Sequence, residues 1–206
     1  MAGSPKPPGK PAVPVGPWEV LDSTYPYRDR WIALRSDTVR LPNGTVLSPY
    51  HVIEFPEWIC ALAITPAREI VLIEEYRHGV RRLSFELPCG TPDAPGEDLL
   101  EATKRELLEE TGYAADDWHF LGASSPNTAR QDNMVHAYLA LDARKVADQS
   151  LDPGELIRTH VVPWDRFLDD LAGGRLELPG PHLAALWQLR TFARKSKDPR
   201  VLALGL

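Results

Sequence analysis

The residues of this chain that could carry chemistry gather in one acidic segment. Glu106, Glu109 and Glu110 recur at i, i+3 and i+4, a spacing that puts three carboxylates on one face of a helix. Like charges this close repel one another, and the dipole near the C-terminal end of a helix opposes them too. A hard divalent cation with oxygen ligands would remove the conflict. Because a solvated acidic face shows the same spacing, the neighbouring residues must decide between the two.

The helix that carries these glutamates is expected over residues 97–112. Gly112 follows its last periodic residue, and a glycine readily takes the left-handed conformation of a helix C-cap. The apolar stripe of this helix is predicted to consist of Leu99, Leu100, Thr103, Leu107 and Leu108.

The rest of the chain is predicted to hold mixed strands and two further helices. β-Branched and aromatic residues dominate from Trp18 onward, and Asn43-Gly44 is the strongest short signal for a hairpin turn. An α+β fold, or a three-layer α/β/α sandwich on a mixed sheet, suits this order. Strands are expected over 31–41, 46–55, 58–64, 69–76, 83–87, 118–123, 134–141 and 156–162. Helices are expected over 164–172 and 181–194, the second with Leu183, Leu186, Trp187 and Arg190 on one side.

Composition limits the class of protein. The chain has 206 residues and a net charge of −6, which disfavours a general nucleic-acid binder. The longest apolar run, residues 58–64, is too short to cross a bilayer, and no secretory signal is recognisable. Cys60 and Cys89 are too few for a disulfide framework or a structural zinc site. We therefore expect a cytoplasmic enzyme with one folded domain, preceded by a disordered proline-rich tail over residues 1–17.

Residues 86–113 resemble the Nudix box, G-x5-E-x7-R-E-U-x-E-E-x-G-U, in which U is aliphatic or aromatic. One departure lies between Gly90 and Glu97, which are separated by six residues rather than five. The extra residue falls in a loop, where single insertions cost little. The positions that match in register are Glu97, Arg105, Glu106, Leu107, Glu109, Glu110, Gly112 and Tyr113.

Two segments before the box narrow the resemblance to one branch of the Nudix hydrolases. Residues 76–79 read Tyr-Arg-His-Gly, and residues 86–90 read Glu-Leu-Pro-Cys-Gly. They are similar to the Q-Y-R and E-L-P-A-G elements of the ADP-ribose and nucleotide-sugar pyrophosphatases. Glu75 stands here where Gln is usual, and Cys89 where Ala is usual.

The resemblance implies an enzyme that depends on Mg²⁺ or Mn²⁺. Glu106 and Glu110 would be the principal metal ligands, Glu109 would bridge or bind a further ion, and the backbone carbonyl of Cys89 would complete the shell. Arg105 would orient the glutamates through an ion pair. These five residues are the expected metal and catalytic centre.

The resemblance also implies residues around that centre. Glu86 would lie near the substrate or metal, and Arg77 would either contact a phosphate or form a structural salt bridge. Trp31 is a candidate substrate-binding residue. The expected general base is Glu155, on a turn-rich loop before a strand, with Asp152 or a box glutamate as the alternative.

The branch implies three segments and an assembly. These are the tail over 1–17, an N-terminal β extension over 18–56, and a Nudix α/β/α sandwich over 57–206. Two copies would form a homodimer in which the extensions complete each other's active sites. ADP-ribose is the first expected substrate, with GDP-mannose or another nucleotide sugar as the alternative. A nucleoside triphosphate pyrophosphatase and a non-catalytic nucleotide-binding module are the less favoured interpretations.

Overall fold

The computed structural model describes residues 15–94 and 96–206. The described part of the chain divides after Phe55 into two compact units, and the second of them begins at Pro56. Most of the predicted proline-rich tail lies outside the described residues. Val15, Gly16 and Pro17, which are described, take no regular secondary structure.

The first unit is a three-stranded antiparallel sheet in the order β1 (Glu19–Arg28), β2 (Ala33–Arg40) and β3 (Val46–Glu54). The predicted hairpin at Asn43-Gly44 is confirmed, because β2 pairs with β3 and Gly44 takes a φ of +84°. Asn43 closes the turn by accepting the Thr45 N–H at 2.9 Å. The strand β1 is exposed along its whole length, so this sheet has little core of its own.

The second unit is built on a mixed seven-stranded sheet. Its central path runs β12 (Arg158–Pro163), β5 (Glu69–Arg77), β4 (Trp58–Ile64), β10 (Val135–Leu141) and β9 (Asp117–Ser124). Two short strands extend it, since β6 (Arg82–Glu86) pairs with β5 and β7 (Cys89–Gly90) pairs with β4. Only β10 and β4 run parallel; every other described pair in this sheet is antiparallel. A separate small sheet joins β8 (Tyr113–Ala114) to β11 (Arg144–Lys145).

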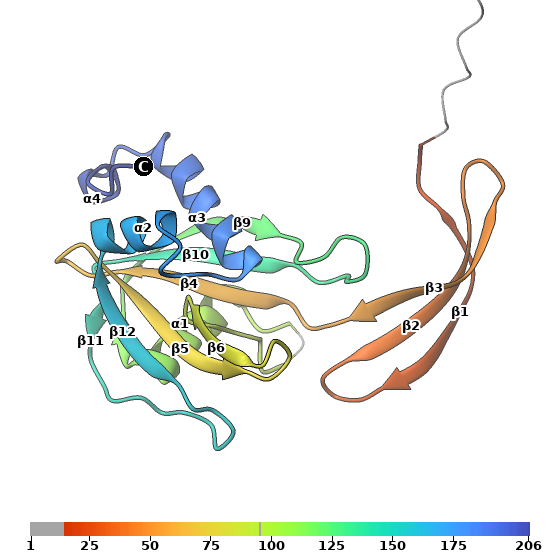
Figure 1. Cartoon of the computed structure of the whole chain (residues 1–206), viewed down its shortest axis with the longest axis horizontal. Coiled ribbons are helices and arrows are strands. Elements are labelled where there is room, and N and C mark those ends of the chain that lie inside the picture. The colour runs from red at the N-terminus through yellow and green to blue at the C-terminus, as the bar shows by residue number, and fades with distance from the viewer. Residues whose placement is uncertain (1–14, 95) are drawn as a thin grey trace, which may run out of the picture. The chain divides into compact units, whose positions relative to one another are not determined.

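Helices cover both faces of this sheet, as the predicted sandwich requires (Figure 1). The helix α1 (Leu99–Thr111) lies on one face, while α2 (Trp164–Ala172) and α3 (Gly180–Ala193) lie on the other. The C-terminal turn α4 (Pro199–Leu202) follows α3. Alternating residues of β4 and β5 serve the two faces, because successive side chains of a strand point in opposite directions. Cys60, Leu62 and Ile64 thus face the larger core, and Ala61 and Ala63 face α1.

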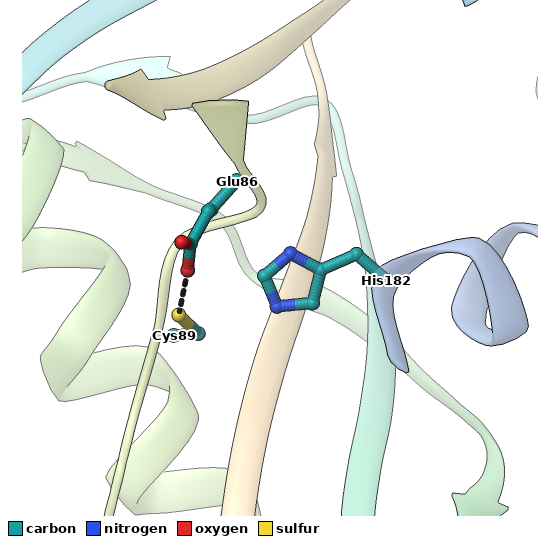
Figure 2. A group of neighbouring side chains, drawn as sticks. All are labelled: Glu86, Cys89 and His182. Carbon is teal, nitrogen blue, oxygen red and sulfur yellow. Dashed lines mark hydrogen bonds between the residues drawn. The ribbon is translucent and has the colours of Figure 1, made fainter. Parts of the chain in front are cut away.

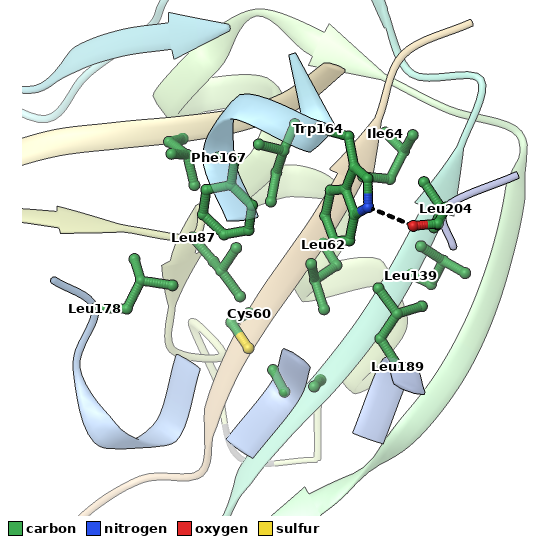
Figure 3. Close-up of a cluster of buried hydrophobic side chains, with 14 of the residues drawn as sticks. Cys60, Leu62, Ile64, Leu87, Leu139, Trp164, Phe167, Leu178, Leu189 and Leu204 are labelled. Atoms are coloured by element: carbon green, nitrogen blue, oxygen red, sulfur yellow. Dashed lines mark hydrogen bonds between the residues drawn. The ribbon is translucent and has the colours of Figure 1, made fainter. Parts of the chain in front are cut away.

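The larger core contains the two bulkiest fully buried side chains, Trp164 and Phe167 of α2 (Figure 3). Trp164 donates its indole N–H to the carbonyl of Leu204 at 2.8 Å, so the C-terminus is fastened to α2. The smaller core is lined with alanines where α1 crosses β4. Small side chains there let the helix approach the sheet closely, which places its glutamates against the backbone of the strands.

Two predicted helix faces are corrected by the structure. The stripe expected for α1 is only partly buried: Leu107 and Thr103 are covered, whereas Leu108 is 38% exposed and Glu110 is buried in its place. In α3 most of the predicted side lies toward solvent: Leu183, Trp187 and Arg190 are exposed, whereas Leu186 is partly buried against the larger core. The face of α3 that packs on the sheet carries His182, Ala185, Leu189 and Ala193.

None of the helices in the described part of the chain is long and apolar enough to cross a membrane. The cytoplasmic location remains a prediction.

Candidate active site

The helix α1 is held at both ends, which sets the direction of its glutamates. At the N-terminus, the Asp98 carboxylate accepts the N–H groups of Leu100 and Glu101 at 2.9 and 3.1 Å. At the C-terminus, Gly112 takes a φ of +72° and donates to the Leu108 carbonyl. A Cβ at Gly112 would lie 2.1 Å from the carbonyl oxygen of Ala147, so only glycine fits.

Glu110 is the most buried of the three box carboxylates, with 3% of its surface exposed. Its Oε2 accepts the backbone N–H of Cys89 at 2.9 Å. Burial raises the pKa of Glu110 to about 9, and the charges of Glu106, Glu75 and Glu155 act in the same direction. No cationic side chain among residues 15–94 and 96–206 forms an ion pair with it. The carboxylate therefore lacks a compensating positive charge from these residues.

Glu106 lies against the backbone of β7. A Cβ added to Gly90 would stand 2.3 Å from the Glu106 carboxyl, so the absence of a side chain at position 90 makes room for the ligand. Burial raises the pKa of Glu106 to about 7, against the opposing effect of Arg105. Two carboxylates with raised pKa values, next to the backbone of β7, offer hard oxygen donors.

Arg105 links the glutamates to the loop in front of the helix. Its Nη1 donates to Glu106 Oε1 at 3.1 Å and to Glu109 Oε2 at 3.0 Å. Its Nη2 donates to the Thr91 carbonyl at 3.0 Å, and its Nε stands 3.7 Å from Glu97 Oε1. The ion pair expected for Arg105 is thus present. Glu109 itself is the most exposed of the three box glutamates.

The guanidinium group of Arg77 is bound by the carboxylates of Glu86 and Glu75. Its Nε and Nη2 donate to the two oxygens of Glu86 at 2.9 and 2.7 Å, and Nη2 also contacts Glu75 at 2.5 Å. Burial by itself would raise the pKa of Glu86, but the bonds and charge of Arg77 outweigh it and leave that pKa lowered. The salt bridge anticipated for Arg77 is present. Its side chain keeps 44% exposure, so the same guanidinium can also meet an anion.

Glu75 is a residue that the sequence analysis left without a role. It lies on β5, and its pKa is raised, first by burial and then by the charges of Glu86 and Glu155. It contributes in turn to the raised pKa of Glu110. The one signal in the sequence was its departure from the usual Gln.

Glu155 approaches the same cluster from the loop before β12. Its Oε2 accepts the Asp152 N–H at 3.0 Å, and its negative charge raises the pKa values of Glu75, Glu106 and Glu110. Asp152 is not among the largest influences on the pKa of any of these three groups. The loop is tied to the end of α1 because Gln149 donates to the Glu110 and Ile157 carbonyls.

A second residue missed at the sequence level is His182 of α3. Figure 2 shows it beside Glu86 and Cys89, and one ligand atom from each of the three lies within 4.8 Å of the others. The Cys89 thiol donates to Glu86 Oε2 at 3.6 Å, and burial raises its pKa well above the usual value. The sequence held one signal for this residue. The spacing of His182, Ala185, Leu189 and Ala193 is that of one helix face, and it would have placed the histidine on the same face as these small and apolar residues.

Trp31 belongs to the first unit, where it is 64% exposed and Arg30 stacks over its ring at 4.3 Å. Its role in substrate binding stays a prediction.

The residues present suit a divalent cation. Glu110 is buried and Glu106 is largely covered, both beside the backbone of Cys89 and Gly90. Mg²⁺ and Mn²⁺ prefer carboxylate oxygen donors of this kind. A bound cation would also supply the positive charge that Glu110 lacks.

Gly90→Ala tests the close approach of β7 and Glu106. The new methyl group must push the flexible Glu106 carboxylate aside, since the three atoms nearest to it all belong to that side chain. We expect a loss of divalent-metal affinity of about 10-fold or more, measured by Mn²⁺ titration with electron paramagnetic resonance. The melting temperature should change little. Gly79→Ala is the control, since its Cβ would meet nothing within 4 Å. Equal metal affinity in the two variants would contradict the assignment.

Comparison with known proteins assigns both units to described families. Residues 56–178 match the NUDIX domain, and residues 18–53 match the nucleoside diphosphate sugar hydrolase N-terminal domain. In the solved structures, an ADP compounds hydrolase shares the fold with a TM-score of 0.71 and 23% identity, covering 89% of this chain and 97% of that one.

Curated relatives agree with this assignment. A methanol dehydrogenase activator from Bacillus methanolicus is 34% identical over 73% of this chain and 80% of its own length. The ADP-ribose pyrophosphatase of Mycobacterium tuberculosis is 32% identical, over 63% of this chain and 62% of its own length. The ADP-ribose pyrophosphatase of Bacillus subtilis is 30% identical, over 64% of this chain and 70% of its own length. With an intact box helix on an α+β sandwich, the chain belongs to the Nudix hydrolase family.

Proposed function

We propose that this protein hydrolyses the pyrophosphate bond of a nucleoside diphosphate sugar, with ADP-ribose as the first substrate and AMP and ribose 5-phosphate as products. The observation that carries the proposal is the pair of Glu106, which is largely covered, and Glu110, which is buried, because burial raises the pKa values of both carboxyl groups. The match of residues 18–53 to a nucleoside diphosphate sugar hydrolase domain supports the substrate class. Two relatives named ADP-ribose pyrophosphatase support the first choice within it.

The chemistry follows from the charge of the substrate. A pyrophosphate diester carries about two negative charges that repel an attacking hydroxide; Mg²⁺, when bound, neutralises them and lowers the pKa of a water molecule. Glu106, Glu110 and the Cys89 carbonyl would hold that ion, with Glu109 near a second one. Arg105 keeps Glu106 and Glu109 in place through its two ion pairs. The exposed part of Arg77 is available to a phosphate oxygen.

Glu155 is the proposed general base. A carboxylate engaged by a metal is a poor proton acceptor, so a nearby carboxylate outside the metal shell is better suited to the task. The charge of Glu155 acts on Glu106 and Glu110, which supports its nearness to the reaction centre. Its position on a turn-rich loop also suits closure over a substrate.

GDP-mannose or another nucleotide sugar is the alternative substrate. Hydrolysis of nucleoside triphosphates is less favoured, because that activity does not require the N-terminal extension. Nucleotide binding without catalysis is less favoured, because it does not require the glutamates of the Nudix box, which this chain retains.

The substrate is tested by a screen. Purified protein with Mg²⁺ is offered ADP-ribose, GDP-mannose, other nucleotide sugars and nucleoside triphosphates, and added phosphatase converts the monophosphate products to free phosphate. We expect release from nucleotide sugars, fastest from ADP-ribose, and none after chelation of the metal. Preference for triphosphates would contradict the proposal.

Glu110→Gln tests the metal centre. Turnover should fall more than about 100-fold because a principal ligand is lost. In metal-free protein the folded state of Glu110 binds a proton up to about pH 9, whereas an unfolded glutamate releases it near 4.5. Stability should therefore fall as pH rises between these values. The variant should lose much of this slope and melt roughly 2–4 °C higher than the wild type at pH 8. Glu101→Gln, on the exposed first turn of α1, is the control and should match the wild type. Near-native turnover of Glu110→Gln would remove the assignment.

Glu155→Gln tests the general base. The amide can still accept the Asp152 N–H, so the turn should persist while the proton acceptor is lost. We expect kcat to fall by about 10²-fold or more with KM and metal affinity nearly unchanged. Asp152→Asn is the matched control and should have a smaller effect. If the two results are reversed, Asp152 is the base; if neither variant loses activity, a box glutamate or metal hydroxide takes the role.

We also propose a homodimer formed through the first unit. The first unit exposes four large aromatic side chains, and a three-stranded sheet with little core is stabilised by a further partner surface. The exposed aromatic residues are Trp18, Tyr25, Tyr27 and Trp31. Light scattering should give twice the chain mass of 23.0 kDa. A fully active monomer at micromolar concentration would overturn this proposal.

A further inference from the structure

His182 reaches the catalytic turn from the helical layer on the opposite side of the sheet. It stands at the start of α3, outside residues 56–178 that match the NUDIX domain, and only 5% of its surface is exposed. In Figure 2 its imidazole extends from α3 toward Glu86 at the end of β6 and Cys89 at the start of β7. A polar ring in such a place must be hydrogen-bonded to be tolerated.

The hydrogen bond that His182 makes defines its state. The backbone N–H of Leu87 donates to Nδ1 at 3.2 Å, so Nδ1 carries a lone pair and the proton of the neutral ring lies on Nε2. Burial lowers the pKa of His182 to about 4, which keeps the ring neutral near pH 7. The ring is thus an acceptor for the turn and not a positive charge next to the metal site.

The turn that His182 holds connects three parts of the candidate site. Glu86, directly before Leu87, binds Arg77 through both carboxylate oxygens. Cys89, two residues after Leu87, donates its N–H to Glu110. Leu87 itself is fully buried, so the position of its N–H is determined from inside the core. A shift of this turn would move the Arg77 anchor and the Glu110 partner together.

We propose that His182 is a positioning residue, whose Nδ1 fixes the Leu87 N–H and thereby aligns Glu86 and Cys89 with the metal-binding face of α1. This inference rests on the proposed function for the substrate used in its kinetic test. Its structural part depends on the turn alone.

The hydrogen bond and the bulk of the ring can be separated by substitution. In His182→Asn the side-chain oxygen lies as many bonds from the backbone as Nδ1, so it can accept the Leu87 N–H. In His182→Leu the shape is kept in part and the acceptor is lost. Leu189→Ala is the control, because Leu189 lies on the same buried face of α3 and does not touch the turn through a hydrogen bond. It reports what a loss of packing in α3 does by itself.

Three measurements are compared across these variants: kcat and KM, the Mn²⁺ dissociation constant, and the hydrogen exchange of the Leu87 amide by NMR. For His182→Leu we expect faster exchange at Leu87, and a kcat and Mn²⁺ affinity each about 10-fold lower. His182→Asn should recover most of both, and Leu189→Ala should keep both within about twofold although it melts earlier.

Two results would overturn the inference. One is a His182→Leu variant that retains kcat and Mn²⁺ affinity, or loses no more of them than Leu189→Ala does. The other is a His182→Asn variant as impaired as His182→Leu, since the acceptor would then be irrelevant. If the wild type hydrolyses no nucleotide sugar, the proposed function fails, and the Leu87 exchange and Mn²⁺ affinity still decide the role of His182.

Discussion

The structure depends on the burial of two carboxylates, Glu106 and Glu110, between a helix and the backbone of a short strand. Burial disfavours the charged forms of these carboxyl groups and raises both pKa values. Ionising both of them without a bound cation therefore costs free energy. Alanines at the helix–sheet contact bring α1 close, and Gly90 leaves room for one carboxylate. Among the described residues Glu110 has no ion-pair partner, and this unpaired acid makes the centre suited to a divalent cation.

Two arginines near this centre form ion pairs with different glutamates. Arg105 neutralises the more exposed side through Glu106 and Glu109, whereas Arg77 is bound to Glu86 and Glu75 on the strands. Glu110 forms an ion pair with neither arginine. The cations of the site thus hold the acids in place and leave the most buried one for the metal.

Local sequence was sufficient for the box helix. Glu106, Glu109, Glu110 and Arg105 all lie on one helix, so their relative positions follow from 3.6 residues per turn and need no long-range information. The same holds for the hairpin at Asn43-Gly44, whose turn closes on its own residues. Strand positions were also predictable, because the nearly continuous apolar runs of β4 and β5 are typical of strands buried on both faces.

The sequence by itself thus determined the family motif, the register of α1 and the order of the long helices and of most strands. It did not predict β1, the two-residue strands β7, β8 and β11, or the turn α4. Only the tertiary structure decided which face of each helix is covered: Glu110 is buried where Leu108 was expected, and α3 turns His182 inward instead of Trp187. It also brought Glu75 and Glu155 to one cluster from separate strands and loops. The physical reason is that the periodicity of a sequence indicates which residues share a face of a helix. Whether that face is buried depends on which other segments of the chain pack against it.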